Sequence, residues 1–535
     1  YLWTTVGTTW KAYDPFTGRW EWSIRDVLSG TNTVGPNGEI LRYTLDLTNG
    51  WMIKWNSTRV VHQTYWDYYK SRPADAAQAD YYSGRWRPHG IVFNYTKGIQ
   101  WNVTIPRGLP GALKDILGED RILGSNTNWS GGNQQPNPVF WAISIKPGDE
   151  GRLIFNVSWP LPSPDLHVDI PGSLPVSLED KVFVVAAKET RVYYGFDLDT
   201  GKQIWGPTSP PEPLLNAFTN LYMAPWGQSK IAYGKLYTAG MAGVVNAYDV
   251  KTGQHLWQYN ITDPYTEQLF SQNWPAPINF IVDGKIYLFH QEHSANTPMP
   301  RGAPAVCLNA TTGEEIWRIN GLRLGTRWGG QPVIADSIIV GFSSYDNRIV
   351  AIGRGPSCIT VSAPEVGVTL GKSVLVKGMV TDISPGTKDP AITMRFPHGV
   401  PAVADECMSD WMLYVYQQHP RPANVKGVEV VVSVLDPNGN CYEVGRATSD
   451  ANGMFSLVFE PPVPGKYTVI ASFAGSKSYW SSSAETALFV EEAPPVSPPP
   501  TPPPQAPVEA YFAVSTLAII VAIVIIGVLL LRKKP

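Results

Sequence analysis

Charged residues are scarce in this sequence. Lys, Arg, Asp and Glu make up 16% of the 535 residues, well below the roughly 25% of an average soluble domain. The formal net charge is only −3, and no long basic or acidic run occurs. Binding to nucleic acid would require a basic surface, so we exclude nucleic acid as a partner.

Cysteine is also rare. The four cysteines are too few for a disulfide-built fold, and their spacing does not match a zinc site. Free buried thiols are one interpretation. A disulfide between Cys407 and Cys441 is the other, provided that the compartment is oxidising.

Catalytic signatures are missing. The sequence has no Gly-x-Ser-x-Gly elbow, phosphate-binding loop or Cys-x-x-Cys pair. His290 and His293 are close in sequence, but a strand would point them to opposite faces, which disfavours joint metal ligation. We interpret the neighbouring carboxylates Glu119 and Asp120 as solvated turn charges. The sequence therefore predicts no catalytic, cofactor-binding or metal-ligating residue.

One short pattern recurs instead, Asp-x-x-Thr-Gly-x-x-x-Trp, each time after an aromatic-rich strand. We interpret it as a β-hairpin in which Asp and Thr hydrogen-bond the turn backbone and Gly takes a positive φ. The Trp of the returning strand can then dock on the neighbouring unit, which stabilises the fold by up to about 4–6 kcal/mol. The four copies are Asp14, Thr17, Gly18 and Trp22; Asp197, Thr200, Gly201 and Trp205; Asp249, Thr252, Gly253 and Trp257; and Asn309, Thr312, Gly313 and Trp317.

A unit repeating about every 50 residues with its own turn predicts a β-propeller. The pattern resembles the tryptophan-docking repeat of pyrroloquinoline-quinone-type propellers. Eroded copies end at Trp55, Trp101 and Trp159. We predict seven or eight blades within residues 1–355, with an N-terminal strand completing the last blade.

The family that the repeat resembles includes both enzymes and scaffolds. It implies, for a quinoprotein dehydrogenase, a quinone and Ca²⁺ on the propeller axis beside a catalytic Asp, often with two adjacent cysteines. No two cysteines are adjacent here, and no residue can be assigned to the calcium ligands. Other relatives, such as the propeller lipoprotein of bacterial outer-membrane barrel assembly, bind no cofactor. We expect no cofactor, with pyrroloquinoline quinone and calcium as the alternative.

From residue 356 the pattern changes to alternating strands separated by Pro-Gly and Asn-Gly turns. This pattern predicts an immunoglobulin-like β-sandwich over residues 356–492, with an irregular insertion at 384–426 that is either functional or packed on a neighbour. The stretch Gly399–Tyr416 resembles uncharacterised archaeal envelope proteins that pair such a module with a propeller. The sandwich strands are predicted at Ser373–Val380, Val428–Leu435, Gly453–Phe459, Gly465–Phe473 and Ala484–Val490.

The C-terminus predicts a membrane anchor. Residues 493–508 form a proline-rich extended linker, and residues 509–531 form an apolar transmembrane helix. The basic residues within 532–535 place this tail in the cytoplasm and the bulk of the chain outside the cell. No apolar leader follows Tyr1, so we expect a truncated or processed product.

Seven Asn-x-Ser/Thr sequons lie in the propeller region and predict N-glycosylation of an exported surface. The alternative is that Asn and Thr simply alternate on exposed strands. The candidates are Asn56, Asn94, Asn102, Asn128, Asn156, Asn260 and Asn309.

The predicted function is that of a non-enzymatic scaffold of the cell surface that binds envelope proteins or glycans. The aromatic segments Tyr65–Tyr69 and Tyr81–Trp86 are expected in loops, where they suit carbohydrate stacking, protein contact or packing between blades. A quinone-dependent dehydrogenase and a carbohydrate-binding or adhesion module remain the alternatives.

Overall fold

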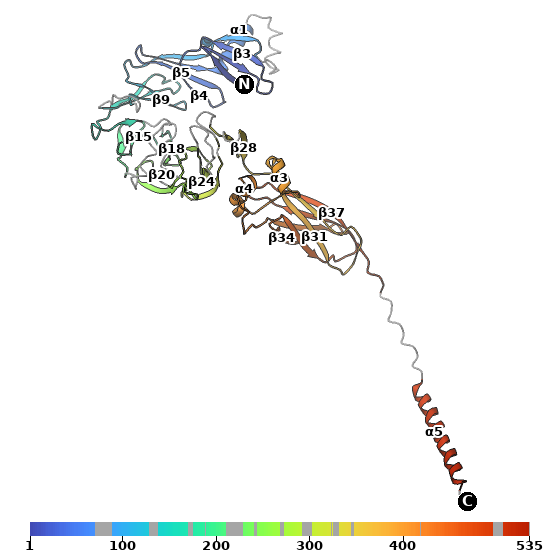
Figure 1. Cartoon of the computed structure of the whole chain (residues 1–535). Helices are drawn as coiled ribbons and strands as arrows, with labels where there is room; N and C mark the ends of the chain where they lie inside the picture. Colours follow the sequence, from blue (N-terminus) through green and yellow to red (C-terminus); the bar gives the residue numbers. More distant parts are fainter. Residues whose placement is uncertain are drawn as a thin grey trace.

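The computed structural model describes residues 1–69, 88–127, 137–169, 175–187, 189–209, 228–239, 243–267, 272–290, 302–322, 324, 331–343, 347–417, 419–495 and 507–533. It is predominantly β, which confirms the predicted all-β class. In the described part of residues 2–352, seven sheets of three to five strands follow one another. Two further sheets and one long C-terminal helix come after them (Figure 1).

The first two sheets share one stretch of chain. Strand β7 (Ile91–Asn94) pairs in parallel with β3 (Trp20–Arg25) of the first sheet, and β8 (Ile99–Thr104) then joins β6 (Trp51–Asn56) of the second. Helix α1 (Ser57–Tyr69) and the 3-10 helix η1 (Tyr95–Gly98) lie in this connection. The first sheet holds β1 (Leu2–Val6), β2 (Thr9–Tyr13), β3 (Trp20–Arg25) and β7 (Ile91–Asn94), and the second holds β4 (Thr31–Val34), β5 (Ile40–Asp46), β6 (Trp51–Asn56) and β8 (Ile99–Thr104).

The next five sheets are each built from consecutive antiparallel strands. They comprise β9 (Ala112–Leu117), β10 (Arg121–Ser125), β11 (Val139–Ser144) and β12 (Leu153–Ser158); β13 (Val168–Asp169), β14 (Val176–Ser177), β15 (Val182–Ala187), β16 (Val192–Asp197) and β17 (Gln203–Trp205); β18 (Gln228–Ala232), β19 (Lys235–Ala239), β20 (Val244–Asp249) and β21 (His255–Asn260); β22 (Ile278–Val282), β23 (Lys285–Phe289), β24 (Pro304–Asn309) and β25 (Glu315–Asn320); and β26 (Val333–Ala335), β27 (Ile338–Ser343) and β28 (Arg348–Ile352).

Each of these sheets packs on the next through an apolar cluster. Between the first two sheets, Trp10 and Trp55 meet edge to face with their ring centroids 5.7 Å apart. Comparable clusters join every later pair as far as the seventh sheet. Figure 1 shows the sheets following one another around an arc. Four-stranded sheets packed in this way resemble the blades of a propeller.

The predicted closure by an N-terminal strand is wrong for the described residues. There β1 pairs only with β2, and β28 pairs only with β27. Leu2 and Val6 of β1 and Ile349 of β28 are exposed. Pairing between the two ends would be a contact of very high sequence separation, and a repeating hairpin pattern does not specify such a contact.

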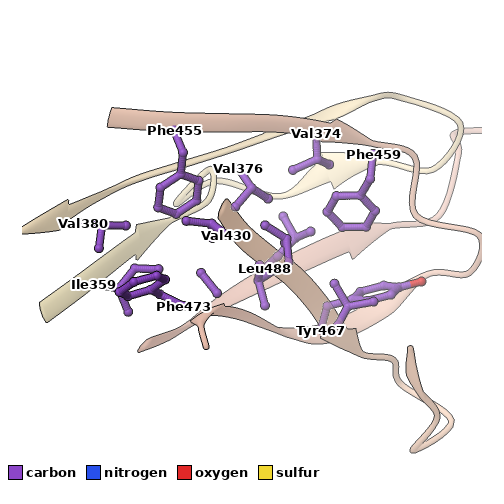
Figure 2. Packing of buried hydrophobic residues seen from close by; sticks show 14 of the residues in the cluster. Ile359, Val374, Val376, Val380, Val430, Phe455, Phe459, Tyr467, Phe473 and Leu488 are labelled. Carbon is purple, nitrogen blue, oxygen red and sulfur yellow. The ribbon is translucent and has the colours of Figure 1, made fainter. Parts of the chain in front are cut away.

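The last two sheets enclose one core. Figure 2 shows Phe455 and Phe459 of β35 in the same core as Tyr467 and Leu488 of the other sheet. Five strands lie within one residue of the predicted bounds or extend past them. One sheet holds β29 (Ser357–Ser362), β31 (Val374–Asp382), β32 (Val400–Pro401) and β35 (Met454–Phe459), and the other holds β30 (Val368–Thr369), β33 (Glu429–Leu435), β34 (Cys441–Thr448), β36 (Gly465–Phe473) and β37 (Ser482–Glu491).

The insertion at 384–426 folds into short helices around a buried Trp411. It packs on the preceding sheets: α4 contacts β25, and the Tyr265 hydroxyl lies 3.1 Å from His419 Nδ1. The insertion is therefore a docking element between the two parts of the chain. Its elements are η3 (Pro385–Lys388), α3 (Pro390–Arg395), η4 (Asp405–Cys407) and α4 (Met408–Gln417).

A second contact fixes the junction between β28 and β29. Gly355 exchanges backbone hydrogen bonds with Ser478 and Trp480, each 2.8 Å long. The Arg354 guanidinium lies 4.3 Å from the centre of the Trp480 ring. Ser357 Oγ donates to the Trp480 carbonyl at 2.7 Å. We name these residues, 354–357 and 478–480, the junction clamp.

Of the two interpretations of the cysteines, the bridge between Cys407 and Cys441 is not formed, and both thiols are free. Cys407 Sγ donates to the Asn424 carbonyl at 3.6 Å, while Cys441 is exposed at the start of β34. Sharing one domain did not bring the two side chains together.

Helix α5 (Val508–Leu531) carries the predicted anchor. Its 24 residues rise about 36 Å at 1.5 Å per residue, enough for a hydrocarbon core of about 30 Å. The most apolar window of 18 residues has a mean hydropathy of 3.1, and none of this window is buried against the rest of the protein. A long, apolar and unburied helix is consistent with a single membrane span.

Candidate functional site

The three intact turns that begin with Asp share one geometry. At the first, Asp14 Oδ1 accepts hydrogen bonds from the Phe16 and Thr17 amides and from Thr17 Oγ1 at 2.7–3.0 Å. The hydrogen bonds from Thr17 lower the pKa of Asp14 below its usual value. Gly18 closes the turn with a φ of +67°, which favours glycine. The turns at Asp197 and Asp249 repeat these bonds.

The Asn copy keeps the turn with fewer bonds to its first residue, whereas Asp46 of an eroded copy still accepts three, one of them from the Asn49 side chain. Asn309 Oδ1 accepts from the Thr311 and Thr312 amides only, while the Thr312 hydroxyl donates to Glu314. Asp46 holds the Thr48 and Asn49 amides in the same way.

The eroded copy that ends at Trp101 has its turn between β7 and β8. Asn94 Oδ1 accepts from the Thr96 amide and hydroxyl at 3.0 and 2.6 Å. Trp55 docks here: its Nε1 donates to the Tyr95 carbonyl at 2.8 Å, and the two rings stack 5.1 Å apart. Asn94 thus takes the part that Asp takes in the intact copies.

The docking residues reach the turn of the following sheet. Trp205 Nε1 donates to the Val250 carbonyl at 2.7 Å, and a Cβ built on Gly253 would lie 2.6 Å from the Trp205 ring. A Cβ built on Gly313 would likewise lie 2.6 Å from the Trp257 ring. Gly253 and Gly313 therefore have a second role, since only the lack of a Cβ lets the ring approach.

Two docking positions differ from the prediction. Phe155, not Trp159, packs on Gly201, where a Cβ would lie 2.5 Å from its ring. The signal was present in the spacing Gly151-x-x-x-Phe155, which matches the spacing from Gly to Trp in the intact copies. Trp22 instead packs edge to face on Trp3 and Phe93.

A buried cation links the third and fourth sheets. The Arg121 side chain is 4% exposed; it pairs with Asp120 and with Asp199, the latter at 2.8 Å, and donates to the Leu198 carbonyl. Burial alone would raise the pKa of Asp120, but hydrogen bonds from Lys146 and Arg121 outweigh it and lower that pKa. The interpretation of Asp120 as a solvated charge is therefore wrong.

Glu119 likewise joins two sheets. It accepts a 2.6 Å hydrogen bond from Lys54, whose side chain is nearly buried, so it is not a freely solvated charge.

The first aromatic segment, predicted to lie in a loop, is helical. Residues 65–69 belong to α1, whose first turn is held by Asn56 Oδ1 through the Thr58 and Arg59 amides. Residues 81–86 lie outside the described residues.

The predicted histidine pair cannot be compared, because residue 293 lies outside the described residues. His290 itself is buried, with Nδ1 2.6 Å from the Pro275 carbonyl. Within the described ranges, no group of three His, Cys, Asp or Glu side chains could hold a metal ion.

An open hollow of ≈ 450 Å³ lies over the edge of the second sheet. Trp51 and Ile53 of β6 line it together with Asn102, Val103 and Thr104 of β8. Trp51 lies opposite Thr104, and Ile53 lies opposite Asn102. Because side chains alternate along a strand, these four share one face of the sheet.

The turns, the docking rings and the stacked four-stranded sheets define a β-propeller built from tryptophan-docking repeats. Residues 150–351 match the family model described as outer membrane protein assembly factor BamB.

Among solved structures, the chain is similar to BamB from Moraxella catarrhalis at 12% identity, covering 69% of this chain and 89% of that one, with a TM-score of 0.29. It is also similar to the computationally designed Ika8 protein at 11% identity, covering 65% of this chain and 94% of that one, with a TM-score of 0.31. The comparison with curated proteins gives no match.

Proposed function

We propose that this protein is a membrane-anchored scaffold of the cell surface whose propeller binds another protein of the cell envelope. The proposal rests on the structural role of the recurring residues. Phe155, Trp205 and Trp257 and the turn glycines opposite them all join one sheet to the next. Residues that recur in this way serve a rigid architecture, and rigid elements present a binding surface with little loss of entropy.

The description of the matched family as an assembly factor favours a protein ligand over a small molecule. Photo-crosslinking of the full-length protein in its own membranes should give discrete adducts with other envelope proteins. Glycans captured on an array in place of such adducts would favour the carbohydrate-binding alternative.

As part of this proposal, the chain divides into a seven-bladed propeller at 1–355, an immunoglobulin-like module at 356–492 with its insertion at 384–426, a linker at 493–508, a membrane helix at 509–531 and a tail at 532–535. A tyrosine corner supports the immunoglobulin-like assignment. The Tyr467 hydroxyl donates to the Val463 carbonyl at 2.8 Å, four residues upstream and at the start of β36.

The proposed topology has the propeller outside the cell and the basic tail inside. Protease added to intact cells should therefore release the bulk of the chain by cutting in or near the proline-rich linker. Immunoblots against the propeller and the tail would follow the release. Protection of the propeller until the membrane is permeabilised would contradict this orientation.

The propeller is further proposed to work without a redox cofactor. Purified protein incubated with pyrroloquinoline quinone and Ca²⁺ should show no stoichiometric uptake of the quinone and no alcohol- or sugar-dependent dye reduction. A quinoprotein dehydrogenase of the resembling family, carried through both assays, is the positive control. Tight stoichiometric binding with turnover would replace the scaffold by a dehydrogenase.

A further inference from the structure

The seven sequons of the propeller region differ in how the structure presents them. Asn102, Asn156 and Asn260 are exposed, and so is the hydroxyl residue two positions on, Thr104, Ser158 or Thr262. All three lie on β8, β12 and β21, each the edge strand of its four-stranded sheet. The alternation of Asn and Thr on exposed strands, noted in the sequence, thus holds for these three.

In three other sequons the asparagine side chain has a structural role. Asn56 is 8% exposed and caps α1 through its amide oxygen. Asn94 donates its amide nitrogen, the atom that a sugar would modify, to Asp26 at 3.0 Å. Asn309 is half-buried and holds its hairpin turn. The seventh, Asn128, lies outside the described residues.

We propose that Asn102, Asn156 and Asn260 carry N-linked oligosaccharides and that Asn56, Asn94 and Asn309 do not. This inference rests on the proposed placement of the propeller outside the cell. The donor is an oligosaccharide linked to a lipid phosphate. The Asn amide nitrogen bonds to the anomeric carbon, the carbon–oxygen bond to the phosphate breaks, the amide loses one proton to a base, and the lipid phosphate leaves.

The hollow described above gives the first sugar on Asn102 a place to lie. Asn102 shares a sheet face with Ile53 directly opposite and with Trp51 two pairs along. An indole ring offers an apolar face on which a sugar ring can pack. The ≈ 450 Å³ volume accommodates at least one monosaccharide.

The edge positions give the sugars a function. An edge strand presents unpaired backbone groups on which another strand can add, and natural proteins cover or interrupt such edges. A bulky glycan in the strand prevents that approach. The edge strand β25 is covered differently, by α4. Sugars on three edges and a helix on a fourth would direct partner binding away from the rim of the propeller.

The test is site-resolved mass spectrometry of glycopeptides from the full-length protein isolated from its own membranes. Sugar is expected on Asn102, Asn156 and Asn260. The substitutions T104A, S158A and T262A remove the sequon hydroxyl and leave the asparagine in place, so each should increase the electrophoretic mobility by one step. The matched controls T58A and T311A should leave the mobility unchanged.

Bare asparagines at all three edge positions, in a propeller that external protease can reach, would overturn the inference while leaving the proposed topology intact. Sugar on Asn56, Asn94 or Asn309 would also overturn it. A propeller protected from external protease would instead show that the proposed placement has failed.

Discussion

Replacing Trp205 with alanine should lower the free energy of unfolding of the propeller by about 3–5 kcal/mol, the range for large buried aromatic truncations. The indole is 8% exposed and lies against Gly253 of the next sheet. Its removal leaves a cavity between two sheets and an unpaired Val250 carbonyl, because Nε1 donates to that oxygen at 2.7 Å.

The measurement is denaturant unfolding of residues 1–492, which lack the apolar helix. Trp20→Ala is the matched control. Trp20 lies on β3 but is 38% exposed, and its indole Nε1 donates to Ser23 Oγ of the same strand. It should cost about 1 kcal/mol or less. Equal losses in the two variants would show that interlocking through the glycine turns does not stabilise the propeller.

Replacing Arg121 with methionine should cost roughly 1–3 kcal/mol, because the buried guanidinium donates charged hydrogen bonds, while Asp120 and Asp199 are 20% and 49% exposed and stay partly solvated. Asp120 and Asp199 would lose the guanidinium between them, and the Leu198 carbonyl would lose its donor. Methionine keeps much of the apolar stem, so the loss reports mainly the charge. Arg152→Met is the control: Arg152 pairs with Asp149 in the same sheet but is 60% exposed, and exposed pairs contribute about 0–1 kcal/mol.

The same cluster should respond to acid. Hydrogen bonds and charge from Arg121 and its neighbours overcome burial and lower the pKa values of Asp120 and Asp199 below the usual 3.8. A carboxyl group whose pKa is lower in the folded state stabilises the fold above its unfolded pKa, and this stability is lost as the pH falls through the folded pKa. The advantage of wild type over Arg121→Met should therefore shrink below about pH 4. Unfolding midpoints of both proteins at pH 3 and pH 7 would measure it, and an unchanged difference would contradict the role of the two carboxylates.

Local patterns predicted the repeated turns and most sandwich strands, because their causes are local. A carboxylate that accepts from amides two and three residues ahead, and a glycine at positive φ, are fixed by adjacent residues. The same holds for the alternation of β33 or β36, where every second side chain is buried.

Other features depended on distant contacts and were missed. The parallel pairing of β3 with β7 joins segments more than 60 residues apart, around a helix that sequence analysis interpreted as loop. Nothing in the sequence around Asp120 indicates that the Arg121 side chain points inward and pairs with Asp199. Asn56 and Asn94 matched a sequon, yet their amides have structural roles that only tertiary packing reveals.

The junction clamp has a mechanical consequence. In a chain held at α5, any pull on the propeller enters the sandwich at Ser357 and leaves at Glu491, the end of β37. Gly355 and Tyr479 form a parallel bridge, so such tension shears the strands along each other. Ser357 Oγ also lies 2.8 Å from the Ser482 hydroxyl, which connects the load directly to β37. Most of the sandwich core is bypassed, and resistance to force becomes a property of this short stretch.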